Sequence, residues 1–87
     1  MKAVITVIGK DTVGILAKVS GVCADVRANV AEVTQSIMQE YFAMIMMIEI
    51  DKMTCSIEEL KGNLGEVLPE MQIHVMHEDI FNSMHRI

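Results

Sequence analysis

The stretch from Val4 to Leu16 constrains the fold most, because it joins a strand to a helix through a short loop. Val4–Ile8 is dominated by β-branched residues and ends at Gly9, and an amphipathic helix opens after Gly14. A helix that starts at the end of a strand presents free backbone N–H groups at its N-terminus. The sequence therefore predicts a small anion-binding site at this loop.

The first helix is predicted over 13–27, where apolar residues recur at helical spacing. Thr12 or Asp11 is the expected N-cap, because a side-chain oxygen there can accept a hydrogen bond from the first turn. The strand before this helix is apolar on both faces except at Thr6. Such a strand is expected in the centre of its sheet.

Three further strands are expected, over 30–39, 42–50 and 71–77. The first of them carries several polar residues, which is typical of an edge strand, and a turn at 39–41 separates it from the next. The strand over 42–50 is apolar on both faces for most of its length, which indicates a second central strand.

The second helix has a clear start and end. Ser56 and Glu59 form a capping box, and Pro69 ends the helical pattern. After the last strand, a tail over 79–87 carries Ile80, Met84 and Ile87 at helical spacing. We expect one domain over 1–78, followed by a short C-terminal helical tail over 79–87.

The order of elements is β-α-β-β-α-β. With right-handed crossovers, this order predicts an α+β, ferredoxin-like βαββαβ fold. Its four-stranded antiparallel sheet has the strand order 4-1-3-2, and both helices lie on one face. The other face carries apolar residues of the first and third strands, and a second copy of the chain is the simplest cover for them.

Composition excludes several classes of protein. The chain has 87 residues, of which 52% are hydrophobic and nine are Met, so a soft aliphatic core and self-association are expected. The net charge is −5 without a basic cluster, which argues against nucleic-acid binding. No apolar run approaches the about 20 residues that span a membrane, and no signal-peptide pattern is present. We expect a cytoplasmic protein in which Cys23 and Cys55 are free thiols.

Other functions of this fold need residues that the chain lacks. RNA-binding modules stack bases on aromatic side chains of the central strands, which here are aliphatic. Soft-metal carriers need a Cys-x-x-Cys in the first loop. An acylphosphatase-like site would need a phosphate-binding Arg in that loop. Ile15 and Leu16 stand where a phosphate loop of nucleotide-binding proteins needs Lys and Ser or Thr.

His74 and His77 have the spacing of metal ligands on a helix, and His85 is a third candidate. On a strand, however, positions 74 and 77 point to opposite faces, so the two side chains do not converge. The prediction is two ordinary histidines on an edge strand, with neither metal nor cofactor.

The first loop remains as the candidate site, although an ordinary strand–helix connection explains the same glycines. For a ligand, the N–H groups of Val13, Gly14 and Ile15 can receive a carboxylate at the positive end of the helix. Asp11 can hold an ammonium group. A carboxylate beside an amine describes a free amino acid.

Residues 7–19, Val-Ile-Gly-Lys-Asp-Thr-Val-Gly-Ile-Leu-Ala-Lys-Val, followed by Arg27-Ala28-Asn29-Val30, resemble the ACT domain, a small-molecule regulatory module. Gln39–Met46 looks like the small stand-alone ACT proteins of uncharacterised function that are related to glycine-cleavage regulators. The chain departs from the ACT pattern at Thr12, Val13 and Ala28, where Arg, Pro and Gly are typical.

The resemblance implies a non-enzymatic module that binds amino acids between subunits. The ligand would contact Asp11, Thr12, Val13, Gly14 and Ile15 of one chain and Asn29 of the same or the partner chain. We therefore hypothesise a homodimer that senses a small amino acid and acts on a regulated protein partner. The alternative is a protein-interaction or assembly module that works through its apolar face without a small ligand, and an enzyme is the third choice.

Overall fold

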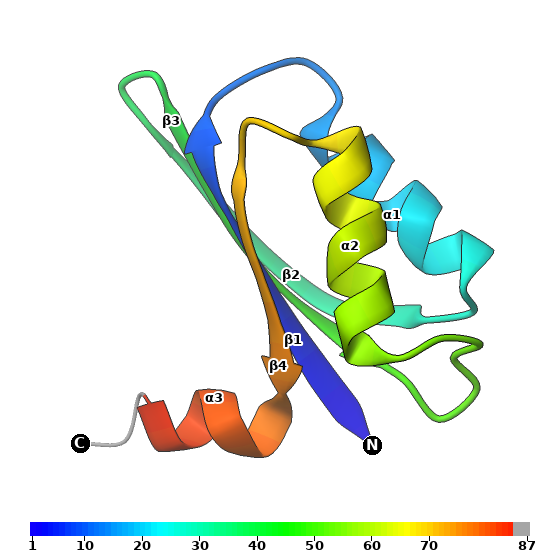
Figure 1. The fold of residues 1–87 in the computed structure, drawn as a ribbon. Helices are drawn as coiled ribbons and strands as arrows, with labels where there is room; N and C mark the ends of the chain where they lie inside the picture. Colours follow the sequence, from blue (N-terminus) through cyan, green and yellow to red (C-terminus); the bar gives the residue numbers. More distant parts are fainter. Residues whose placement is uncertain (85–87) are drawn as a thin grey trace.

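The computed structural model describes residues 1–84. They form a four-stranded sheet with two helices on one face, and a third helix ends the described chain (Figure 1). The strand order is β2-β3-β1-β4 and every pairing is antiparallel, which confirms the predicted ferredoxin-like arrangement. The elements are β1 (Lys2–Lys10), α1 (Ile15–Asp25), β2 (Asn29–Met38), β3 (Tyr41–Glu49), α2 (Ile57–Val67), β4 (Gln72–His77) and α3 (Glu78–Met84).

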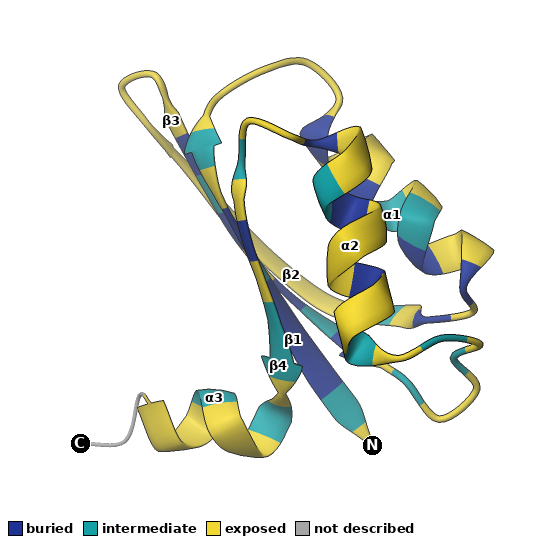
Figure 2. Ribbon diagram, viewed as in Figure 1, coloured by how far each residue is buried: buried dark blue, intermediate teal, exposed yellow. Residues whose placement is uncertain are grey.

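The hydrophobic core lies between the two central strands and the helices α1 and α2. Alternate residues of β1 and β3 contribute to this core, and side chains from both helices complete it. Figure 2 shows buried residues along the central strands and on parts of α1 and α2. Residues of this core with no exposed surface include Ile5, Val7, Met46, Ile48, Val19, Leu60 and Leu64. The core is aliphatic and methionine-rich, as the composition predicts.

The β2–β3 hairpin closes where it was predicted, through Gln39 and Glu40. Gln39 adopts a positive φ of 59°, which allows two residues to reverse the chain without Gly or Asn. The tip of this hairpin is also tied to the loop after β1, because the Asp11 backbone N–H donates to the Glu40 carbonyl oxygen at 2.7 Å.

The two long helices begin differently. The capping box of α2 is present as predicted: the Glu59 N–H donates to Ser56 Oγ at 3.1 Å, and the Ser56 N–H donates to Glu59 Oε1 at 3.2 Å. The predicted N-cap of α1 at Thr12 or Asp11 is wrong. The cap residue is Gly14, in the left-handed conformation, so the helix starts two residues later than predicted.

The third helix lies on the face of the sheet opposite α1 and α2, where it contacts β1 and β4 (Figure 1). It covers part of the face that was expected to be open. Val4 there has no exposed surface, whereas Ile8 is 49% and Ile45 is 43% exposed. Ile87 of the predicted tail lies outside the described residues. Within residues 1–84, no helix is long and apolar enough to cross a membrane.

Candidate functional site

The loop between β1 and α1 is fixed at its base and exposed at its tip. Asp11 is held through its backbone N–H by the β2–β3 hairpin, which leaves its carboxylate exposed. Thr12 is also exposed, and Val13 is 97% exposed. The loop therefore presents side chains on a tethered backbone.

Gly14 turns the chain into α1 with φ 85° and ψ 15°, a left-handed conformation that favours glycine. Among the described residues, nothing lies within 4 Å of the position that a Cβ would occupy, so the backbone angle and not space selects glycine here. The next residue, Ile15, buries its side chain in the core at 3% exposure. Only its backbone is available to a ligand.

The N-terminus of α1 is electrostatically unsatisfied in the described part of the chain. No side chain of residues 1–84 caps the first turn, and that turn carries no acidic residue. Its N–H groups and the positive end of the helix dipole can therefore receive an anionic group such as a carboxylate. By contrast, Ser56 and two acidic residues already serve the start of α2.

Asn29 lies at the opposite end of the sheet from this loop. The strand register places Asn29 level with Glu49 and Lys2, whereas the loop follows Lys10. At about 3.3 Å per strand residue, the length of β1 separates the two by roughly 25 Å. The Asn29 side-chain Nδ2 donates to Glu49 Oε1 at 2.7 Å. One chain alone therefore does not bring Asn29 together with the loop.

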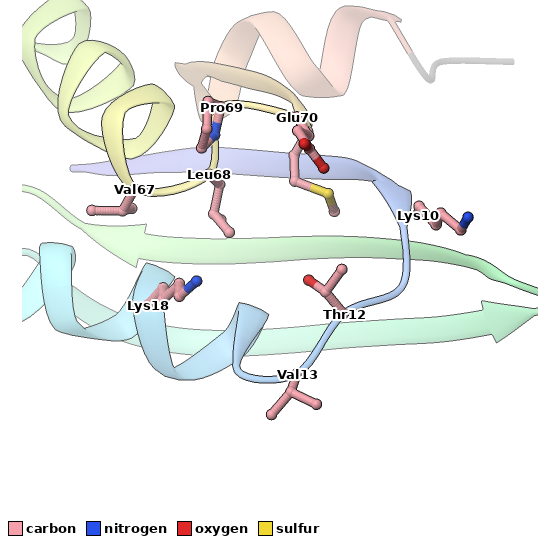
Figure 3. A pocket seen from close by; sticks show the side chains of 9 residues that line it. Lys10, Thr12, Val13, Lys18, Val67, Leu68, Pro69 and Glu70 are labelled. Carbon is pink, nitrogen blue, oxygen red and sulfur yellow. The ribbon is translucent and has the colours of Figure 1, made fainter.

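A cavity of about 250 Å³ opens between this loop and the segment that connects α2 to β4 (Figure 3). Thr12 and Val13 are the only two predicted site residues among the described residues that line it. The sequence did not predict its other charged members, Lys10, Lys18 and Glu70. The sequence spacing could have indicated Lys18, because it follows Gly14 by one helical turn. Glu70 could not be found in this way, because it comes from a loop that is distant in the sequence.

The histidines do not form a metal site in the described chain. His74 is paired with Thr6 and His77 with Ala3, so their side chains point to opposite faces of β4, as predicted. Within residues 1–84, no group of three His, Cys, Asp or Glu is placed to hold a metal ion. His85 lies outside the described residues.

Both cysteines are free thiols in the described structure, as predicted. Burial raises the pKa of Cys23 to about 11. The pKa of Cys55 is also raised, first by burial and then by the negative charge of Glu59. These shifts keep both thiols protonated at neutral pH, which disfavours a nucleophilic role.

The fold agrees with comparisons to known proteins. The family model of the ACT domain matches residues 2–78. A UPF0237 protein of Listeria monocytogenes is 47% identical in an alignment of 90 residues that covers 100% of each chain. A solved ACT domain protein from Streptococcus pneumoniae is 34% identical, with a TM-score of 0.76 over 98% of each chain.

A third comparison shows the same fold within a larger chain. A formyltetrahydrofolate deformylase from Pseudomonas syringae has a TM-score of 0.79 at 21% identity, over 87% of this chain and 27% of that one. ACT domains are in general regulatory modules that bind small molecules. The extent of the family match and the identity to UPF0237 proteins lead to one conclusion: the chain belongs to the ACT domain family.

Proposed function

We propose that this protein is a non-enzymatic regulatory module that binds a small amino acid as a homodimer. The observation that carries the proposal is the uncapped start of α1, directly after an exposed loop that bears the Asp11 carboxylate. The N–H groups of Val13, Gly14 and Ile15 receive the ligand carboxylate, while Asp11 attracts its ammonium group. Thr12 supplies a hydroxyl beside them.

The dimer follows from the unpaired edge of β2. This strand pairs with β3 on one side only, and most of its residues are exposed. Antiparallel pairing of β2 with its own copy joins two sheets through a twofold contact. In our proposal the two β2 strands pair over their full length, so that Asn29 of the partner subunit is level with Met38. Within one chain, Met38 is level with Tyr41 and Lys10, at the end of the sheet where the ligand loop begins. Asn29 thus completes the site between subunits.

The remaining assignments follow from this arrangement. Residues 1–78 form the amino-acid-binding unit, and the tail that begins at residue 79 is attached to it. The protein acts in the cytoplasm, where free amino acids report metabolic state. Occupancy of the site changes how the dimer meets a regulated protein partner.

Calorimetry with each of the twenty amino acids tests the ligand, and light scattering at micromolar concentration tests the dimer. We expect saturable heat for at least one amino acid, a raised melting temperature with that ligand, and the mass of a dimer. The absence of heat for all twenty, together with an unchanged melting temperature, would rule out the amino-acid site.

A protein-interaction module without a small ligand is the second candidate. The observation in its favour is the apolar end of the β2–β3 hairpin, where Ile37, Met38 and Tyr41 are 58%, 64% and 56% exposed. This end projects beyond the helices (Figure 1). If this candidate is correct, Asp11→Ala leaves partner binding intact, whereas Ile37→Lys weakens it.

A further inference from the structure

The helix α3 forms one wall of an apolar hollow on the face of the sheet opposite α1 and α2. It follows β4 without a connecting loop and contacts β4 and β1 (Figure 1). Its residues Phe81 and Met84 stand beside a cavity of about 360 Å³ whose floor is formed by β1, β3 and β4. This volume falls in the range of small-molecule pockets.

The walls of this cavity are almost entirely apolar. Besides the two residues of α3, the aliphatic side chains come from all three strands and include Ile8, Ala43, Ile45 and Met76. Among the described residues that line it, none is Lys, Arg, Asp or Glu. A charged ligand would lose water there without gaining a partner of opposite charge, so the cavity favours a neutral one.

Two polar side chains lie next to each other in the floor of this cavity. Thr6 and His74 are directly opposed across the β1–β4 pairing and point to the same face. Opposed side chains in an antiparallel pair have Cβ atoms about 5 Å apart. A hydroxyl and an imidazole there can each donate or accept a hydrogen bond. Apolar walls with a convergent polar pair are the usual anatomy of a ligand pocket.

We propose that this cavity is a second binding site, for a neutral aromatic molecule of one or two rings that carries one hydrogen-bonding group. The rings lie between α3 and the aliphatic residues of β1 and β3, and the polar group bonds to Thr6 or His74. The unbranched Met76 and Met84 side chains adapt to the shape of the rings. The site is independent of the amino-acid loop and does not require a dimer.

Indole is a suitable probe because it is neutral, bicyclic and carries a single N–H donor. Methionine methyl signals in a proton–carbon NMR titration report on the site, since Met44, Met76 and Met84 line the cavity and Met46, Met53 and Met71 do not. We expect saturable shifts at the three lining methionines only, with a Kd on the order of 1 mM or below for a ligand of this size. Indole-3-acetate, which adds a carboxylate, should bind at least several-fold more weakly.

Three variants locate the site. Ala43→Phe fills the cavity and should abolish the indole shifts, while unchanged shifts at Met46 and Met71 show that the chain remains folded. Ile45→Ala removes part of the wall and should weaken binding several-fold. The matched control is Ile37→Ala, because Ile37 is also an exposed strand isoleucine but lies outside the cavity.

Two results would overturn the proposal. One is a set of shifts that fails to saturate or spreads over all methionines, which describes non-specific contact. The other is a concentration-dependent shift of Met76 and Met84 without indole, abolished together with self-association by Ala43→Phe, which would make this face an interface with a second copy.

Discussion

Arg27 occupies the backbone position that ends α1, and its conformation is unusual for a residue with a side chain. Its φ is 61°, in the left-handed region. The Ala28 N–H donates to the Cys23 carbonyl oxygen at 2.8 Å, and the Arg27 N–H donates to the Ala24 carbonyl oxygen at 3.2 Å. These two bonds make a Schellman motif, in which glycine usually takes the place of Arg27. The chain therefore stores strain at this residue, and not at Ala28, where the ACT pattern has its glycine.

Arg27→Gly should raise the free energy of unfolding by about 0.5–1 kcal/mol, because relief of the left-handed strain exceeds the entropy that glycine adds to the unfolded chain. Urea denaturation measures the change. Arg27→Ala is the control, since alanine keeps the strain and should bring no gain. An equal gain in both variants would assign the effect to the arginine side chain.

Cys23 should lower the stability of the folded chain at alkaline pH. Its pKa is about 11 in the folded chain, above the ordinary thiol value, because the side chain is buried. Between these two values the unfolded chain loses the thiol proton while the folded chain keeps it. The contribution of Cys23 to the free energy of unfolding is therefore fully present at neutral pH. It falls by up to about 2 kcal/mol as the pH rises from about 9 to 11.

Urea denaturation at pH 8 and pH 10.5 measures this loss, with Cys23→Ala as the reference for all other titrating groups. The wild-type chain should lose more stability between the two pH values than the variant does. Parallel losses in the two proteins would show that Cys23 does not couple to folding.

At the scale of elements, the two helices contrast in how their N-termini are satisfied. The first turn of α2 is closed by its own capping box, whereas α1 starts at Gly14 without a side-chain cap within residues 1–84. A helix start that binds a ligand has to leave its N–H groups open. The capping box gives the N-terminus of α2 a structural role, whereas the open N-terminus of α1 is what the proposed ligand site requires.

Ser56→Ala should lower the free energy of unfolding by about 1 kcal/mol, because it removes the oxygen that accepts the Glu59 N–H. Thr12→Ala is the matched control at the start of α1 and should stay within about 0.5 kcal/mol of the wild type. Thermal and urea unfolding give both values. A loss for Thr12→Ala as large as that for Ser56→Ala would show that α1 is capped after all.

At the scale of the whole molecule, the strand order followed from the sequence because residues apolar on both faces identify central strands. The capping box likewise located α2. The start of α1 was misplaced, because Gly14 caps through its backbone angle while Asp11 and Thr12 only have the side chains of caps. Spacing in the tail predicted a helix but could not tell which face α3 would cover, since that depends on the direction in which the chain leaves β4.

The candidate site shows the same limit. Spacing identified the loop, but Lys10, Lys18 and Glu70 meet only in three dimensions. The distance between the loop and Asn29 follows from topology: β1 runs to one end of the sheet, and α1 returns the chain to the other. A site that includes both therefore requires two copies of the chain.

Mixing two variants tests directly whether the ligand site is shared between two subunits. Once calorimetry has identified the ligand, Asp11→Ala and Asn29→Ala should each abolish binding as separate homodimers. After the two are unfolded together and refolded in equal amounts, half of the dimers are mixed, and each mixed dimer has one intact site. We expect about a quarter of the original binding stoichiometry to return. No recovery on mixing, or full binding by the Asn29→Ala homodimer, would contradict a site shared between subunits.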